Sequence, residues 1–211
     1  MNAHDTAVDL LLAHGPGPQP RADARRNVAK LVAAAREAIA DIGVEAATAH
    51  EIARRAGVGV GTFYRRIPSR EVLLEAVLTE LLTDLVTLAR TALAAPDPWT
   101  GFRDFAAGYV RLRTRSCGIN EALGGSCGIA PKAPLADLRE QIRLLVDRTH
   151  AAGVLRPDVT WQDVPFLLAG VATAARTIGL TADDHQWERN LHIILDGLST
   201  ARPNPLPPHR P

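Results

Sequence analysis

The chain has 211 residues, 46% of them hydrophobic, and a formal net charge of +1. This length and apolar content allow a sizeable buried core and exclude a chain that is disordered throughout. The charge is unevenly spread, because residues 21–70 hold ten Lys/Arg against five Asp/Glu, whereas residues 71–211 hold fourteen against sixteen. A basic segment on a mildly acidic remainder predicts an anionic partner near the N-terminal third.

The sequence predicts neither a targeting or membrane-spanning segment nor a set of structural disulfides. It has no uncharged apolar run of about eighteen residues, as a transmembrane helix would need, and residues 1–20 lack the basic start of a signal peptide. Two cysteines, Cys117 and Cys127, are too few for a disulfide framework. We therefore expect a cytoplasmic protein.

Four helices are predicted in the first part of the chain. Residues 1–20 contain GPGPQP and are expected to be a flexible tail. Thr48 and Glu51 have the spacing of a capping box, which begins a short second helix that Gly57 closes. The first helix is expected at about 23–42, with the apolar stripe Val28, Leu31, Val32, Ala35, Ile39 and Ile42. The third helix is expected at about 59–66 and is ended by Pro68. The fourth helix is expected after Ser69, with the apolar stripe Leu73, Val77, Leu81, Leu85 and Leu88.

The rest of the chain is also predicted to be helical. No period-two alternation is long enough to indicate a strand, so the expected fold class is all-α with about nine helices. Residues 203–211 are Pro-rich and are expected to be disordered. Helices are predicted at about 99–114, 134–152, 161–179 and 184–200, with a loop or short helix over 117–130.

The segment AGVGVGTFYRR, residues 56–66, indicates a helix-turn-helix motif. Gly57 permits the left-handed backbone of the turn, and Val58 is expected to fill the space between the two helices. Gly59 and Gly61 would let the second helix approach a rigid surface closely, as a helix in the DNA major groove must. The alternative is a pair of loop glycines beside a solvated arginine face, but the capping box, the turn and the basic bias all favour the motif.

Residues 48–78 resemble the DNA-binding signature of the tetracycline-repressor (TetR) family, and residues 21–47 resemble that family's first helix. The resemblance implies a helix-turn-helix domain over residues 21–67 and a ligand-binding and dimerisation domain over residues 68–202. Gly59 stands where many members have Ser, Arg66 where His is common, and Ile67 where Phe is common. The DNA-binding residues that the resemblance implies are Arg25, Thr48, Gly59, Val60, Gly61, Thr62, Tyr64, Arg65, Arg66 and Arg70.

Two apolar helices are expected to form a dimer interface across a two-fold axis. The helix over 161–179 is apolar nearly all round, so it must be covered on most sides; burial inside the monomer is the alternative. The segment GVLRPDVTWQDVPFLL is also similar to the SbtR-like class of C-terminal domains within the family. The expected interface residues are Leu167, Val171, Ala174, Trp187, Leu191, Ile194 and Leu195.

A ligand pocket is predicted around an aromatic stripe at helical spacing, although such a stripe is more often plain core. The two cysteines could form a redox switch, and inert thiols are the alternative. The scattered histidines do not have the spacing of a metal site, and no cofactor motif is present. The candidate pocket residues are Phe102, Phe105, Tyr109, Leu112, Cys117, Cys127 and Phe166.

These features favour a ligand-responsive transcriptional regulator, expected to act as a homodimeric repressor on a palindromic operator in double-stranded DNA. Release of the DNA on binding an unknown small-molecule effector is implied by the family and is not visible in the residues. A regulator controlled by a protein partner or by its own abundance is the first alternative. An enzyme with a helical pocket is the second, and it lacks any catalytic motif.

Overall fold

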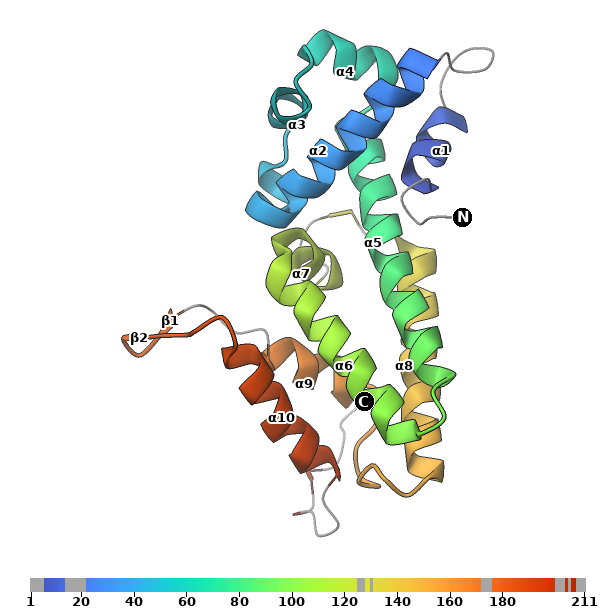
Figure 1. Cartoon of the computed structure of the whole chain (residues 1–211), viewed down its shortest axis with the longest axis vertical. Coiled ribbons are helices and arrows are strands. Elements are labelled where there is room, and N and C mark those ends of the chain that lie inside the picture. Colours follow the sequence, from blue (N-terminus) through green and yellow to red (C-terminus); the bar gives the residue numbers. More distant parts are fainter. Residues whose placement is uncertain are drawn as a thin grey trace. The chain divides into compact units, whose positions relative to one another are not determined.

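A computed structural model of the chain describes residues 6–13, 22–124, 128–129, 131–171, 176–199, 204 and 206–207. Within these residues the chain forms ten helices and one two-stranded hairpin (Figure 1), which confirms the all-α class. It divides into two compact units, one of Met1–Asp84 with Arg115–Leu135 and the other of Leu85–Thr114 with Ala136–Pro211. Among the described helices, none is long and apolar enough to cross a membrane.

The first unit is built around a long helix. Helix α2 packs against α1, α3, α4 and α7, and the fully buried side chains between them include Leu31, Ile39, Ile52 and Phe63. Its helices are α1 (Thr6–Ala13), α2 (Ala22–Ala46), α3 (Ala49–Arg55), α4 (Val60–Arg66), α7 (Cys117–Gly124) and the first part of α5 (Arg70–Leu93).

Helix α1 replaces part of the predicted flexible tail. Ala7, Val8 and Leu11 are buried in the core of the first unit, and Asp9 forms an ion pair of 2.7 Å with Arg25 of α2. The prediction of a flexible segment is therefore wrong for residues 6–13. The AVDLLLA run has apolar residues at helical spacing, and packing stabilises a helix too short to form alone.

Helix α7 lies very close to α2. A Cβ atom added at Gly118 would stand 1.9 Å from Cγ2 of Ile39, so only glycine fits there. Nearby, Gly43 interrupts α2 with a φ of 82°, and the next amide, Val44 N–H, donates a 2.7 Å hydrogen bond to the Glu121 carboxylate of α7. Ile42, expected on the buried stripe, is 41% exposed because it lies beside this break.

Replacing Gly118 with alanine is expected to destabilise the first unit. The new methyl group would overlap Ile39, and overpacking of this kind costs about 1–3 kcal/mol of unfolding free energy. Chemical denaturation monitored by circular dichroism measures the loss. Gly61→Ala is the matched control, because a Cβ there meets nothing within 4 Å; equal stability of the two variants would contradict the close contact.

The second unit is a set of helices whose ends are closed by side-chain and backbone caps. Arg148 donates hydrogen bonds to the carbonyl oxygens of Leu93 and Ala95 at the end of α5. Gly153, with a φ of 68°, ends the longest helix of this unit. The elements are the end of α5, α6 (Pro98–Arg115), α8 (Lys132–Ala151), α9 (Asp163–Val171), β1 (Arg176–Thr177), β2 (Leu180–Thr181) and α10 (Gln186–Ser199).

The predicted helix over 161–179 is shorter than expected. Helix α9 ends at Val171, and Arg176 pairs with Thr181 in a small antiparallel hairpin. Ile178 and Gly179 both have positive φ at its turn, the backbone of a type I′ hairpin turn. Strands of two residues are too short to show alternation, so this element was missed.

The C-terminal residues that the structure describes are held by two charged side chains. Arg156 donates to the carbonyl oxygen of Asn204 at 2.6 Å, and the Leu206 amide donates to Asp158 at 3.1 Å. Bonds from Arg156 hold the pKa of Asp158 down at about 2. The prediction of disorder is therefore wrong for Asn204 and Leu206.

Candidate nucleic-acid interface

Helix α3 begins at the predicted cap. The Thr48 side chain accepts a 3.2 Å hydrogen bond from the Glu51 amide. Glu51 does not complete a capping box, because its carboxylate accepts hydrogen bonds from Arg54 and Arg55, which lower its pKa to about 2. Arg55 also donates to Asp41 of α2 at 2.6 Å, so both arginines have carboxylate partners within the first unit. The exposed Arg65 and Arg66 belong to α4.

The turn between α3 and α4 is a Schellman motif. The Val58 amide donates to the Ala53 carbonyl at 3.0 Å, and the Gly57 amide donates to the Arg54 carbonyl at 3.2 Å. Gly57 has a φ of 67°, the left-handed conformation that glycine adopts without strain. The turn therefore has the geometry that the sequence predicted.

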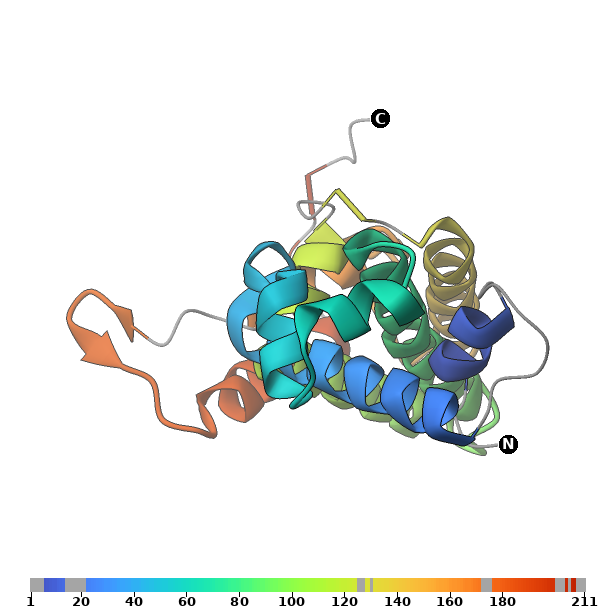
Figure 2. The same cartoon turned by 90° about the horizontal axis from the view of Figure 1, so that it is seen from above.

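One face of α4 is anchored in the core and the other is exposed. Phe63 and Ile67 are fully buried, and α4 packs against α2 and α3 (Figure 2). Ile67 is extended, as the residue before Pro68 must be, and ends the helix. The exposed side chains are Val60 at 39%, Tyr64 at 59%, Arg65 and Arg66.

Gly59, the N-cap of α4, and Gly61 within the helix are not required by the fold. Neither has a positive φ, and a Cβ at Gly59 or Gly61 would meet nothing within 4 Å. Glycine inside a helix costs about 1 kcal/mol relative to alanine, so Gly61 weakens the helix without an internal reason. Because Gly59 and Gly61 have no side chains, a rigid surface could approach the backbone closely at these positions.

The other predicted contacts have partners within the chain. Arg70 donates to the Ala47 carbonyl at 2.8 Å and closes the end of α2, so a phosphate contact would have to replace this bond. Arg25 is ion-paired with Asp9, and Arg65 donates to the Thr62 hydroxyl at 2.9 Å. Thr62 is half-buried and Thr48 is exposed. These placements leave Val60, Tyr64, Arg65 and Arg66 as the side chains that α4 presents outward.

The predicted pocket residues that the structure describes lie in two different places. Phe102, Phe105 and Tyr109 are buried. Their rings form two separate pairs, Phe105 with Tyr109 at 5.8 Å between ring centroids and Phe102 with Trp99 at 5.7 Å. Leu112 is half-buried beside them. Phe166 is 81% exposed and lines a separate groove between α9 and α10. Cys127 and the side chain of Cys117 lie outside the described residues.

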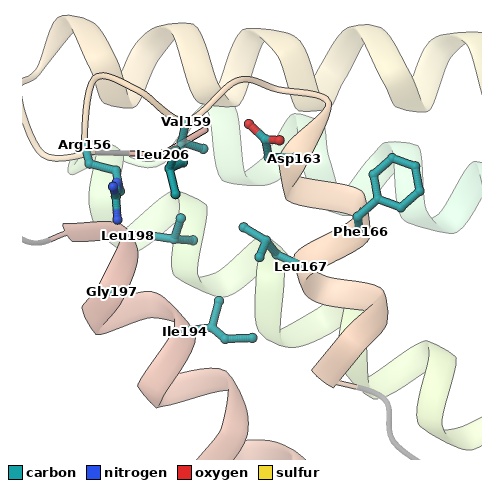
Figure 3. A pocket seen from close by; sticks show the side chains of 9 residues that line it. All are labelled: Arg156, Val159, Asp163, Phe166, Leu167, Ile194, Gly197, Leu198 and Leu206. Atoms are coloured by element: carbon teal, nitrogen blue, oxygen red, sulfur yellow. The ribbon is translucent and has the colours of Figure 1, made fainter. Parts of the chain in front are cut away.

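Helices α9 and α10, together with Val159 and Leu206, line an open apolar groove of about 390 Å³ (Figure 3). Leu167, Ile194 and Leu198 point into it, with Arg156 and Asp163 at its edge. Of the expected dimer residues, Leu167, Trp187 and Ile194 are half-buried, Val171, Leu191 and Leu195 are buried within the chain, and Ala174 lies outside the described residues.

Sequence reasoning missed Ile193, which is 69% exposed on α10. The signal was the pair of adjacent isoleucines, because one helix face cannot bury both Ile193 and Ile194. Within the part of the chain that the structure describes, no group of His, Cys, Asp and Glu could hold a metal ion.

Comparisons with known proteins agree with this arrangement. A model of the bacterial regulatory proteins of the tetR family matches residues 31–77, and a model of the C-terminal domain of SbtR-like transcriptional regulators matches residues 97–200. Comparison with the curated proteins gives no match.

Solved structures resemble the chain over most of its length. A TetR transcriptional regulator from Streptomyces coelicolor is 30% identical, with a TM-score of 0.59, over 83% of this chain and 99% of that one. A TetR regulatory protein from Mycobacterium vanbaalenii is 32% identical, with a TM-score of 0.57, over 85% and 99%. A gamma-butyrolactone receptor is 19% identical, with a TM-score of 0.62, over 85% and 91%, and so supports the fold alone.

Proposed function

Because the chain belongs to the TetR family of DNA-binding transcriptional regulators, we propose that it acts in the cytoplasm as a homodimeric repressor of a palindromic operator. The observation that carries the proposal is the outward face of α4, where Tyr64, Arg65 and Arg66 stand beside two bare glycines. A helix with this face supplies a hydroxyl, cations and close backbone approach to the major groove.

A second copy of the chain would bring two such helices together. In a two-fold dimer they would sit about one DNA turn apart, roughly 34 Å, and contact successive major grooves. The exposed apolar side chains of α9 and α10, together with the groove of Figure 3, support this part of the proposal. Exposed apolar surface of this kind is typical of a site where a protein partner binds.

We further propose that a small-molecule effector binds the second unit and releases the operator, by favouring a dimer state whose α4 helices no longer match the groove spacing. The alternative is a regulator without a small ligand. Its support is that Phe102, Phe105 and Tyr109 are buried, with Phe102 stacked on Trp99 and Phe105 packed against Tyr109.

The first experiment is footprinting of the purified full chain on DNA from its own upstream region, with a salt titration. A protected palindrome is expected, with affinity that falls steeply as salt rises because phosphate contacts release counterions. Selection from random DNA tests for a distant operator. Failure of both assays to yield a preferred sequence would contradict the proposal.

Replacing Gly61 with alanine is expected to separate DNA binding from folding. The unfolding free energy should stay the same or rise by up to about 1 kcal/mol, because alanine is the better helix former. Operator affinity should fall at least tenfold, since the methyl group holds the backbone away from the DNA. Thermal melts and titrations of the same preparation measure both; unchanged affinity would show that this backbone does not approach the groove.

A further inference from the structure

Val60 is an unusual side chain to find at the proposed DNA-contacting face. Within α4, all of which the structure describes, it is the only exposed aliphatic residue, with 39% of its surface accessible. The exposed neighbours Tyr64, Arg65 and Arg66 all carry hydrogen-bonding groups. An apolar group there must either remain in water or meet an apolar group of the partner.

The surroundings of Val60 allow it to reach deeply. Gly59 precedes it and Gly61 follows it, and a Cβ at either position would meet nothing within 4 Å. No side chain on either side therefore limits the approach of the Val60 backbone. In contrast, the nearest hydroxyl on α4, that of Thr62, already accepts a 2.9 Å hydrogen bond from Arg65.

The major groove offers one apolar group for such a side chain. All four base pairs present hydrogen-bond donors and acceptors there, and the thymine C5-methyl is the only apolar group among them. Valine against any other base edge would cover polar atoms without pairing them, which is unfavourable. We infer that Val60 reads a thymine methyl group in each half of the operator; this inference rests on the proposed function.

The test uses deoxyuridine, which differs from thymidine only by the missing methyl group. Once the operator has been footprinted, each thymine is replaced singly and the affinity of the full chain is measured. One thymine in each half-site should lose about fourfold in affinity, the value for one buried methyl-sized group. Replacing both symmetry-related thymines should lose about fifteenfold, because the two contacts are independent.

The variant Val60→Ala assigns the effect to this residue. It should bind the thymine operator more weakly and show no further loss at the deoxyuridine position. Val72→Ala is the matched control, because Val72 is also an exposed valine of the first unit, at 37%, but lies on α5. The control should bind the thymine operator as wild type does and should lose the same affinity when the thymine is replaced by deoxyuridine.

The outcomes separate this inference from the proposed function. A footprint in which no deoxyuridine substitution matters would overturn the inference and leave the repressor proposal intact. A methyl effect that persists in Val60→Ala would assign the reading to another side chain and also overturn it. The absence of any preferred DNA sequence would overturn both.

Discussion

A chain carrying Phe166→Glu and Ile193→Glu is expected to fold normally, to be monomeric and to lose operator binding. The two side chains are 81% and 69% exposed, so the glutamates would be solvated in the monomer and should not affect its stability. In a dimer that covers these positions, two-fold symmetry would bury four carboxylates without partners, which is strongly unfavourable. Each apolar side chain lost also removes about 1.5–3 kcal/mol of burial.

Loss of the dimer should have a large effect on DNA binding. A monomer holds one half-site and loses the effective concentration that the second copy supplies, so operator affinity should drop on the order of a hundredfold or more. Light scattering at micromolar concentration gives the assembly state, and a titration of the operator gives the affinity.

The matched control is Leu144→Glu, at a side chain that is 36% exposed on α8 of the same unit. It should remain dimeric and bind the operator as wild type does. A doubly substituted chain that stays dimeric would place the interface elsewhere than on the exposed side chains of α9 and α10.

The helix-turn-helix was predictable because its signals are local. The Thr48 cap, the left-handed Gly57 and the stop before Pro68 each follow from the conformational preferences of a few neighbouring residues, and each has the predicted geometry. The open surroundings of Gly59 and Gly61 add what the sequence could not show. Neither close packing nor backbone strain therefore explains why glycine occupies these two positions.

The second unit was harder to predict because it depends on which apolar side chains meet. Phe166 and Phe102 were both predicted to line a pocket, yet one is 81% exposed and the other is fully buried. Likewise, Val171, Leu191 and Leu195 were expected to face a partner but are buried within the chain. Periodicity identifies an apolar face, but it does not say whether the same chain or a second copy covers it.

The adjacent residues Phe63 and Tyr64 are expected to separate the stability of the first unit from its proposed DNA contact. Phe63 is fully buried, whereas Tyr64 is 59% exposed and touches Phe63 edge-on at 5.1 Å between ring centroids. Phe63→Ala should therefore lower the unfolding free energy by about 3–5 kcal/mol, because a large cavity would form beneath α4. Operator binding should fall as a consequence, to the extent that α4 is no longer held in place.

Tyr64→Ala should instead lower operator affinity much more than it lowers the unfolding free energy. It removes one exposed ring and its edge-on contact, worth about 1 kcal/mol or less, while operator affinity should drop roughly tenfold to a hundredfold for the loss of a phenol at the DNA face. Denaturation curves give the unfolding free energy of each variant, and operator titrations give its affinity for DNA. If Tyr64→Ala instead lowered stability as much as affinity, the exposed face of α4 would be structural. If it lowered neither, Tyr64 would make no contact with the operator, which would contradict its place in the proposed DNA-binding face.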